Sequence, residues 1–510
     1  MISVLQRTPY AGALLTGLLM GIAFPPGFLG AMAWVGLVPL FMRLLTVLDW
    51  RRVVLESVVA SGITTMIVGY WTLFHLIPSA RAASLAGLVA LALTSSIPFW
   101  MFGIPGKQTS PVLRLGLLLC SAVIIEYAHF HTEIGFPWLA LGHTQATLSP
   151  VNQLATFIGA PGLSVWVLVS NGLILHTVLG TRRQRGIASA AFGLFLLASL
   201  ILGFLRLRSE RDVVDRFEVL AVQPALPAEA WSDVHDRTRL LRLIELTKDA
   251  VDPNIDLIVW PETTLPVLEA RDEPSKEYVE LSSFVDSAGI PLLTGAVIEE
   301  EHAETGQLVY YNSAVVLSPL VGITGRYDKR IPVPFAERVP YLDRYPWLER
   351  LAVKAGGVSG YGIGTRPGKI QIDGTSVGIM ICFESAFGRA TRSTEPETPA
   401  YFVVLAQDGW WGNTAGYQQH FAITRLRAIE TGRAIVQVTV TGTTGLILPD
   451  GSSVGDTEWM ERVAVRFQVP AYVGSTPYTR FGDIPILALC LLFFVSGYVK
   501  YARVHVHKSG

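Results

Sequence analysis

The sequence predicts a multi-pass α-helical membrane domain joined to an α/β domain of alternating strands and helices. Three observations lead to this prediction. Half of the 510 residues are hydrophobic and only 16% are charged, which is typical of a membrane protein with a soluble part. Long apolar segments separated by short loops fill residues 1–208. From residue 209 to residue 483, short apolar runs alternate with amphipathic segments, which indicates α/β layers.

Residues 1–208 are expected to form the membrane domain, with about seven transmembrane helices. The expected spans lie near residues 10–24, 28–47, 55–76, 83–104, 112–130, 154–179 and 187–206. A further span, near residues 484–501, begins the last predicted segment, 484–510, which ends in a short tail. The first span has a weakly charged start and lacks a small-residue cleavage site, so we interpret it as a retained anchor.

Loop charges predict the orientation of the chain. Lys and Arg residues gather in alternate loops and at both chain ends, namely Arg7, Arg43, Arg51, Arg52, Lys107, Arg114, Arg182, Arg183, Arg185, Lys500, Arg503 and Lys508. The intervening short loops carry only Arg81, and Arg206 and Arg208 are a minor exception. By the positive-inside rule, both termini lie in the cytoplasm and residues 209–483 lie outside it.

Composition also bears on partners and cofactors. A net charge of −1 gives no reason to expect nucleic acid as a partner. Three cysteines do not suggest a disulfide framework, and no cluster with metal-ligand spacing is visible. We therefore expect neither a metal nor another cofactor.

The apolar spans contain one conspicuous carboxylate. Glu126 would be costly in hydrocarbon, so it is expected to face the interior of the helix bundle or a polar partner. The loop that follows, Gly135-Phe136-Pro137-Trp138, has two interpretations. It could shape a lipid entrance, or it could belong to an ordinary aromatic belt at the membrane surface.

Residues 209–483 contain the predicted strands and helices of the α/β domain. Strands are expected at residues 217–222, 255–260, 291–297, 310–317, 377–381, 401–405, 434–440 and 444–448. Helices are expected at residues 237–250, 277–287 and 417–431. The last of these helices is expected to carry ion pairs, and its His420 is interpreted as a structural or supporting residue.

The strand at residues 377–381 ends at Cys382, where α/β folds collect their ligands. Cys120 and Cys490 lie in apolar segments, so Cys382 is the one thiol of the polar region. A lone strand cysteine is ordinarily structural. Here, however, two other charged side chains also follow predicted strands: Glu262 after Trp260-Pro261, and Lys329 after a strand and its turn. A carboxylate as general base, an amine as cation and a thiol as nucleophile make chemical sense together.

Two further carboxylates lie close to these residues in sequence. Glu337 stands in a proline-stiffened loop soon after Lys329, where it could keep the lysine charged; pairing with Arg338 or simple solvation is the alternative. Glu384 lies two residues after Cys382, and its alternative is a solvated turn charge.

The order of these motifs resembles that of the carbon–nitrogen hydrolase (nitrilase) superfamily, whose Glu-Lys-Cys triad has the same order along the sequence. Membrane spans on both sides of such a domain resemble the apolipoprotein N-acyltransferase family. The motifs that carry the resemblance are Val222-Gln223-Pro224, Trp231, Trp260-Pro261-Glu262, Tyr311-Asn312-Ser313, Tyr327-x-Lys329, Val333-Pro334-Phe335-x-Glu337, Cys382-x-Glu384, Asp408-x-Trp410 and Arg425-x-Arg427-Ala428-x-Glu430-Thr431-Gly432-Arg433.

The resemblance implies a fold and a set of site residues. Residues 209–483 would form a nitrilase-like αββα sandwich, with Glu262, Lys329 and Cys382 as the catalytic triad. The supporting or substrate-binding residues would be Trp231, Glu337, Glu384, Phe383, Asn312 and Trp410. The sequence departs from the family pattern at Phe383, where Tyr is usual, and also at Ala336, Val440 and Ala230, where Gly, Asn and Lys are usual.

The resemblance also implies a reaction. Cys382 would take an acyl chain from a phospholipid as a thioester and pass it to the N-terminal amine of diacylglyceryl-cysteine on an apolipoprotein. Membrane lipid would be a further partner, and no cofactor or metal would be needed. The protein would be a multi-pass protein of the bacterial inner membrane, with its catalytic domain on the periplasmic side.

Two alternatives stay open at this point. A membrane-tethered amidase could use the same triad on a soluble amide, with water resolving the intermediate. A non-catalytic membrane scaffold could use the domain only for binding. Acyl transfer to a diacylated lipopeptide would separate the first alternative from the acyltransferase, and replacing Cys382 with Ala would separate the second.

Overall fold

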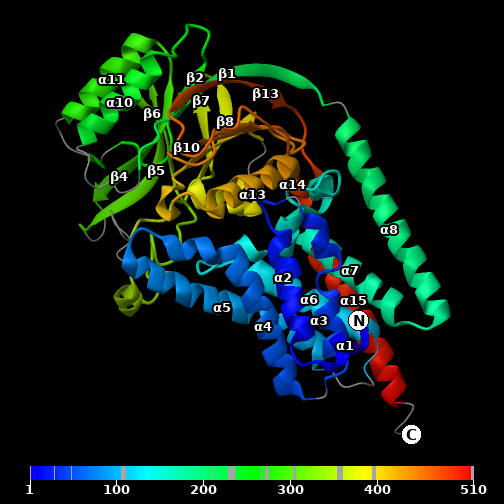
Figure 1. The fold of residues 1–510 in the computed structure, drawn as a ribbon. Helices are drawn as coiled ribbons and strands as arrows, with labels where there is room; N and C mark the ends of the chain where they lie inside the picture. The colour runs from blue at the N-terminus through cyan, green and yellow to red at the C-terminus, as the bar shows by residue number, and fades with distance from the viewer. Residues whose placement is uncertain are drawn as a thin grey trace. The chain divides into compact units, whose positions relative to one another are not determined.

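The chain folds into two compact units. The computed structural model describes residues 2–27, 29–47, 49–104, 109, 111–209, 211–227, 236–265, 267–269, 275–301, 306–352, 360–392 and 398–506 (Figure 1). The helical unit comprises Met1–Trp71, Ser84–Ser209 and Pro477–Gly510. The α/β unit comprises Thr72–Ala83 and Glu210–Thr476.

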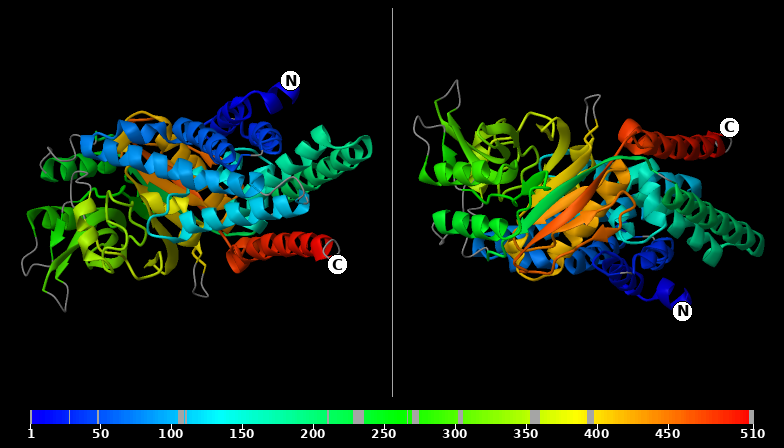
Figure 2. Two further views of the ribbon diagram at one scale, coloured as in Figure 1. Left: turned by 90° about the horizontal axis from the view of Figure 1, so that it is seen from below. Right: turned by 90° about the horizontal axis from the view of Figure 1, so that it is seen from above.

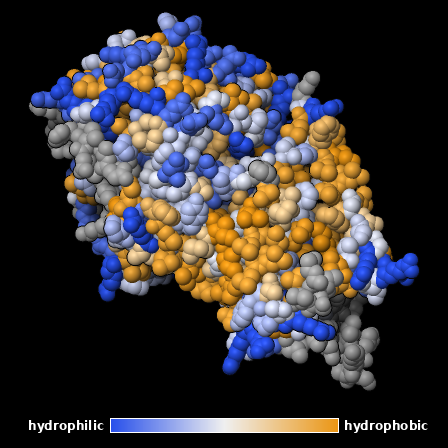
Figure 3. Space-filling model, in the orientation of Figure 1, coloured by the Kyte–Doolittle hydropathy of each residue, from blue (hydrophilic) through white to orange (hydrophobic). Residues whose placement is uncertain are grey.

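Apolar helices build the helical unit. Its helices are α1 (Ile2–Arg7), α2 (Ala11–Ala23), α3 (Val38–Leu44), α4 (Trp50–Gly69), most of α5 (Pro78–Gly103), α6 (Pro111–His131), α7 (Ala155–Leu179), α8 (Arg182–Arg208), α14 (Pro477–Phe481) and α15 (Ile484–Val506). Five helical stretches among the described residues are long and apolar enough to cross a membrane: Trp50–Phe74, Pro78–Gly103, Leu113–His131, Val151–Leu179 and Arg182–Arg208. Hydrophobic side chains gather on the surface of these helices (Figure 3). The predicted multi-pass helical fold is confirmed, whereas the number of spans stays a prediction.

The region expected as one span at residues 28–47 is broken. It forms a short 3₁₀ helix, η1 (Gly30–Trp34), and then α3. Pro39 stands at the start of α3, where its fixed φ and missing N–H favour the first turn of a new helix over the continuation of an old one. Hydrophobic length alone did not reveal this break.

Two of the basic residues used to predict the orientation are buried. Arg43 lies in the helical unit and forms an ion pair with Glu56 of α4, at 2.8 Å between Nη2 and Oε1. Arg114 of α6 donates from Nη1 to the carbonyl oxygen of Phe102 at 2.8 Å. Arg43 therefore adds no net charge to its loop, and the predicted orientation rests on the exposed arginines such as Arg51, Arg52 and Arg182.

The α/β unit contains two sheets. In the first, the strand order is β13-β1-β2-β4-β5-β6, and β3 also pairs with β4. Its strands are β1 (Val213–Gln223), β2 (Leu257–Val259), β3 (Val267–Glu269), β4 (Leu292–Glu301), β5 (Leu308–Ser318), β6 (Gly322–Asp328) and β13 (Val463–Tyr472). The second sheet has the order β12-β11-β10-β9-β8-β7. Its strands are β7 (Lys369–Ile372), β8 (Thr375–Ile381), β9 (Tyr401–Ala406), β10 (Ile435–Thr439), β11 (Gly445–Ile447) and β12 (Ser453–Val454).

The two sheets pack face to face between helices. Val219 and Ala221 of β1 point into the core between the sheets, together with Ile379 of β8. The alternate β1 residues Leu220 and Val222 point the other way, as the two-residue period of a strand requires, and pack under α10 (Asp236–Lys248) and α11 (Lys276–Ala288). Met380 and Phe402 pack under α13 (Ala415–Thr431) on the opposite outer face. Figure 1 shows this helix–sheet–sheet–helix order, and the predicted αββα sandwich is confirmed.

Strand β13 was not predicted from the sequence. It pairs antiparallel with β1 over most of its length, and the two strands run side by side in Figure 2. Pro470 lies within it and has no N–H to donate to a neighbouring strand, so the sequence of this segment does not indicate a strand. Proline is tolerated here because β13 is the edge strand of its sheet.

A close contact beneath β8 generates a test of this packing. Gly378 pairs with Phe402 of β9, and a methyl group at position 378 would overlap the Phe402 ring. Gly378→Ala is therefore expected to lower the stability of the detergent-solubilised protein by about 1–3 kcal/mol, through overpacking. Thermal unfolding measures this loss as a lower midpoint. The matched control is Gly193→Ala on α8, where a methyl group meets open space and is expected to leave the midpoint equal or slightly higher. Equal midpoints for the two variants would contradict the packing described.

Candidate active site

Cys382 lies where the central strand β8 ends. It is the first residue of the 3₁₀ turn η7 (Cys382–Ala386), and its φ of +49° falls in the left-handed region that non-glycine residues seldom adopt. Such strain is found where the surrounding structure fixes a functional side chain. Cys382 as a whole residue is half-buried, and the backbone N–H of Gln407, just after β9, donates to its thiol. The thiol is thus held at the carboxyl end of two parallel strands, the usual place for a ligand site in an α/β fold.

Two carboxylates, Glu262 and Glu337, surround one lysine at the end of the other sheet. Lys329 directly follows β6, and its Nζ lies 3.2 Å from Glu262 Oε1 and 2.8 Å from Glu337 Oε1. Glu262 follows β2, and Asn312 on β5 donates from Nδ2 to Glu262 Oε1 at 2.8 Å and to Glu337 Oε1 at 3.2 Å. Lys329 is only 2% exposed and Glu262 only 4%. A buried ammonium requires such paired carboxylates, because an unpaired charge in this setting costs several kcal/mol.

The charges of this cluster set the protonation states. Burial lowers the pKa of Lys329, but Glu262, Glu337 and Cys382 raise it, and the net result lies well above the ordinary value. Burial raises the pKa of Glu262; Lys329 opposes this effect and Glu337 adds to it, and the net direction is upward. Lys329 is therefore a cation, and Glu262 is a stronger base than an exposed glutamate.

The thiol of Cys382 is protonated at neutral pH. Burial raises its pKa well above the ordinary value, and the negative charge of Glu262 adds to this effect, whereas Lys329 opposes it. A nucleophilic role for this cysteine therefore requires a base to take its proton. The charge of Glu262 acts on the thiol, so this carboxylate is a candidate for that base.

Glu384 joins the Cys382 turn to the segment that carries Lys329. It is fully buried, and its Oε1 accepts hydrogen bonds from the backbone N–H groups of Arg330 at 2.8 Å and Ile331 at 3.1 Å. Its Oε2 accepts from the N–H of Ile381 at 2.8 Å, and the Tyr327 hydroxyl lies 2.9 Å from both oxygens. The carboxylate thereby ties the two sheets together at the site, and the alternative of a solvated turn charge is wrong.

The other residues expected at the site differ in what they contact. Glu337 contacts Lys329 and accepts from the N–H of Val333 at 2.6 Å, while Arg338 pairs with Asp343 instead. Phe383 is buried against Phe387, with ring centroids 5.0 Å apart. Trp231, together with the neighbouring Ala230, lies outside the described residues.

Trp410 contacts a segment that the sequence did not link to it. It is half-buried, and its ring stacks on His75 at 5.8 Å, while its carbonyl oxygen accepts from the N–H of Leu76 at 3.1 Å. His75 and Leu76 belong to the Thr72–Ala83 segment of the α/β unit, more than 300 residues away in the chain. No local pattern in the sequence points to this contact.

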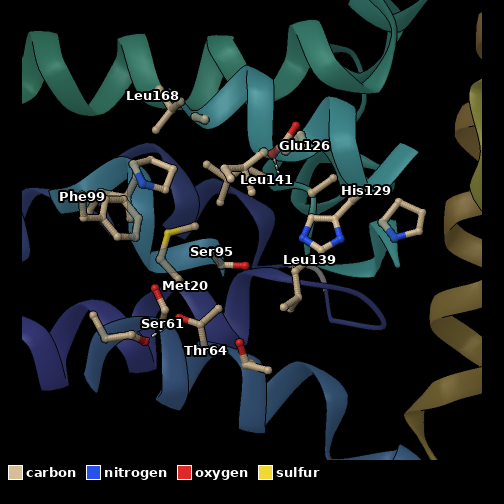
Figure 4. A pocket seen from close by; sticks show the side chains of 18 of the residues that line it. Met20, Ser61, Thr64, Ser95, Phe99, Glu126, His129, Leu139, Leu141 and Leu168 are labelled. Carbon is tan, nitrogen blue, oxygen red and sulfur yellow. Dashed lines mark hydrogen bonds between the residues drawn. The ribbon is translucent and has the colours of Figure 1, made fainter. Parts of the chain in front are cut away.

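The interior of the helical unit contains a cavity of about 70 Å³ (Figure 4). Met20, Phe99 and Leu139 contribute apolar walls, and Glu126 and His129 also line it. The N–H of Leu141 donates to Glu126 Oε1 at 2.9 Å, so this carboxylate faces the bundle interior and a polar partner, as expected. Phe136 and Pro137 of the aromatic loop line the same cavity. None of the residues lining it belongs to the cluster around Cys382.

The buried charge cluster generates a second test. Lys329→Met would leave Glu262 and Glu337 facing each other without a cation, and breaking a buried ion pair from one side costs about 3–5 kcal/mol. We expect a large drop in the thermal unfolding midpoint, larger at pH 8 than at pH 5, because protonation relieves the repulsion between the two carboxylates. Lys276→Met, at an exposed position of α11, is the control and is expected to change little. A Lys329→Met protein as stable as this control at pH 8 would refute the charge balance described.

Comparisons with known proteins show which families the chain resembles. The carbon–nitrogen hydrolase family model matches residues 221–478, and the model of the apolipoprotein N-acyltransferase N-terminal domain matches residues 16–173. The chain is 29% identical over 520 residues to the apolipoprotein N-acyltransferase of Chlorobaculum tepidum, covering 95% of each chain. It is 26% identical over 539 residues to that of Geobacter metallireducens, covering 99% of this chain and 97% of the relative.

A solved structure, Saccharomyces cerevisiae Nit3, a member of branch 10 of the nitrilase superfamily, is 14% identical with a TM-score of 0.40, covering 54% of this chain and 97% of that chain. The carbon–nitrogen hydrolase model alone spans half of the sequence, and the acyltransferase relatives match along nearly its whole length. The chain belongs to the carbon–nitrogen hydrolase superfamily and, within it, to the apolipoprotein N-acyltransferase family.

Proposed function

We propose that this protein transfers an acyl chain from a phospholipid to the N-terminal amine of a diacylated apolipoprotein, through a thioester on Cys382. The names of the relatives that match both parts of the chain support the reaction class. One observation carries the assignment of residues: the Glu262–Lys329 ion pair is buried, and both of its charges act on the Cys382 thiol. A base, a cation and a nucleophile in one buried cluster form the minimum set for acyl transfer.

In the first half-reaction, Glu262 takes the proton of the Cys382 thiol and the thiolate attacks the ester carbonyl carbon of the phospholipid. The resulting oxyanion is stabilised by the Lys329 ammonium and by the backbone N–H that follows Cys382. The ester C–O bond then breaks, and the leaving lysophospholipid alkoxide takes the proton from Glu262. The acyl group remains bound to Cys382 through a new C–S bond.

In the second half-reaction, the free α-amine of the apolipoprotein attacks the thioester carbonyl. Glu262 takes a proton from the amine, the C–S bond breaks, and an amide C–N bond forms. The Cys382 thiolate recovers the proton from Glu262, which returns the site to its starting state. One base thus serves both halves of a ping-pong reaction.

The neighbouring residues support this chemistry by position. Glu337 and Asn312 hold Lys329 and Glu262 in contact, and Glu384 fixes the Lys329 segment against the Cys382 turn. Trp410 and Trp231 are proposed to contribute to substrate contacts, and Phe383 is proposed to support the Cys382 turn by packing against Phe387. The same proposal puts the protein in the bacterial inner membrane, with residues 209–483 on the periplasmic side, both termini in the cytoplasm, and no cofactor.

Replacing the nucleophile tests the proposal. Cys382→Ser and Cys382→Ala are both expected to lower acyl transfer to a diacylated lipopeptide by about 10³-fold or more, as removal of a covalent nucleophile does in other enzymes. Transfer is measured with labelled phospholipid and the full-length protein in detergent micelles. Cys120→Ala is the control, because Cys120 lies on α6 in the helical unit. Near-normal transfer by Cys382→Ser, or hydrolysis of a soluble amide without any transfer by the unaltered protein, would overturn the proposal.

The pH profile tests the role of Glu262. As a base it must be ionised, so kcat/KM should rise with pH through the Glu262 pKa, which burial first and then Glu337 place above the ordinary 4.5. Glu337→Gln removes one of the charges that raise this pKa, and the acid limb is therefore expected to move to lower pH. The exposed Glu349→Gln is the control and should leave the limb in place. A limb that stays in place or moves to higher pH in Glu337→Gln would exclude Glu262 as the titrating base.

A further inference from the structure

A buried histidine lies against the backbone of Cys382. His420 is on α13, and its Nε2 is 3.1 Å from the Cys382 carbonyl oxygen and 2.8 Å from Ser385 Oγ. Its Nδ1 is 2.9 Å from Asp408 Oδ1. The side chains of His420 and Asp408 are each only 3% exposed. The mechanism above uses neither of them.

These contacts bear on the protonation of the ring. Nδ1 donates to the Asp408 carboxylate, whereas Nε2 donates to the Cys382 carbonyl if it carries an N–H and can accept from the Ser385 hydroxyl if it does not. Neutral imidazole carries only one N–H, whereas imidazolium carries two. The buried carboxylate of Asp408 also needs a counter-charge. Burial lowers the pKa of His420, but Asp408 and the Cys382 carbonyl raise it above the ordinary 6.5, in agreement with the hydrogen bonds.

The carbonyl that His420 contacts belongs to the peptide group between Cys382 and Phe383. The N–H of that same group is the backbone donor assigned above to the oxyanion. Because a trans peptide is planar, a donor fixed on its C=O also fixes the direction of its N–H. A cationic donor on the C=O additionally polarises the group and strengthens the N–H as a donor.

We propose that His420 is a permanently protonated positioning residue that cancels the charge of Asp408 and aims the Phe383 N–H at the oxyanion. This inference rests on the proposed function for the oxyanion and on the buried contact with Asp408 for the charge. Asp408, after β9, and Glu262, after β2, are titratable groups that act on His420, and the Cys382 carbonyl on η7 contacts its ring. On α13 itself, Arg427 and Glu430 pair with each other at 2.7 Å. Without the imidazolium, Asp408 would oppose negative charge on the thiolate and on the oxyanion.

The test uses three variants of the full-length protein in detergent micelles: His420→Gln, Asp408→Asn and the double variant. The first readout is the rate at which iodoacetamide alkylates Cys382, followed against pH by mass spectrometry of the Cys382 peptide. This readout needs no lipid substrate, so it reports on His420 even where the proposed transfer reaction fails. The second readout is kcat and KM for acyl transfer. His176→Gln, at an exposed position of α7, is the control.

His420→Gln leaves the Asp408 charge uncompensated. It is expected to raise the pH midpoint of Cys382 alkylation by about one unit, as a nearby like charge does. It should also lower kcat about 10- to 100-fold, less than the loss of a direct oxyanion donor, with KM nearly unchanged. The double variant should restore the midpoint to that of the unaltered protein, because it removes both charges, while kcat stays low. A midpoint and kcat equal to those of His176→Gln, with only a lower unfolding temperature, would reduce His420 to a structural role and overturn the proposal.

Asp408→Asn keeps the test decisive where His420→Gln does not fold. If His420 is imidazolium, loss of Asp408 deprives it of its counter-charge and the buried ring loses its proton. Cys382 then loses one negative and one positive neighbour, and its alkylation midpoint should stay near that of the unaltered protein. If His420 is neutral, the variant removes only a negative charge, and the midpoint should fall. A fall of about one pH unit would overturn the proposal.

Discussion

The Lys329 ammonium is the group on which the site depends. It is buried beside Cys382, so it persists as a cation only because Glu262 and Glu337 lie within 3.2 Å and 2.8 Å of it. Burial and the charge of Glu337 raise the basicity of Glu262, and the charge of Lys329 opposes the burial that keeps the Cys382 thiol protonated. The proposed base and the proposed oxyanion-stabilising cation therefore arise from one arrangement of charges.

The two sheets position this arrangement. In the first sheet, Glu262 follows β2, Lys329 follows β6 and Asn312 lies on β5, whereas Cys382 directly follows β8 of the second sheet. Packing of the sheets brings these strand ends to one edge, and Glu384 fixes them there with donors from the Lys329 segment and from Ile381. Glu384 accepts from backbone N–H groups and from the Tyr327 hydroxyl, so it fixes the geometry through neutral donors. Glu384, two residues after Cys382, therefore fixes the geometry, whereas Glu337, eight residues after Lys329, pairs with the lysine.

Strong local patterns made much of the fold predictable. Buried parallel strands read as continuous apolar runs, so β8 and β9 were located almost to the residue, and so was helix α13. Features that depend on tertiary contacts were not predictable. They are the buried ion pair of Arg43, the edge position of β13 that allows Pro470 within it, and the stacking of Trp410 on His75. At the site, motif order suggested that Glu262, Lys329 and Cys382 belong together, but the donors Tyr327, Arg330 and Ile331 lie more than fifty residues from Glu384 in sequence, which left its role open. His420 carries no local signal that distinguishes it from an ordinary core histidine.

The proposal as a whole stands on a covalent bond between an acyl group and Cys382. The direct measurement is to incubate the full-length protein with phospholipid labelled in its acyl chain, without any acceptor, quench in acid, and analyse the Cys382 peptide by mass spectrometry. We expect that peptide to gain the mass of one acyl group, which hydroxylamine removes and which a diacylated lipopeptide discharges as an amide. Acylated lipopeptide produced in a single turnover while the Cys382 peptide stays unmodified would contradict the proposal.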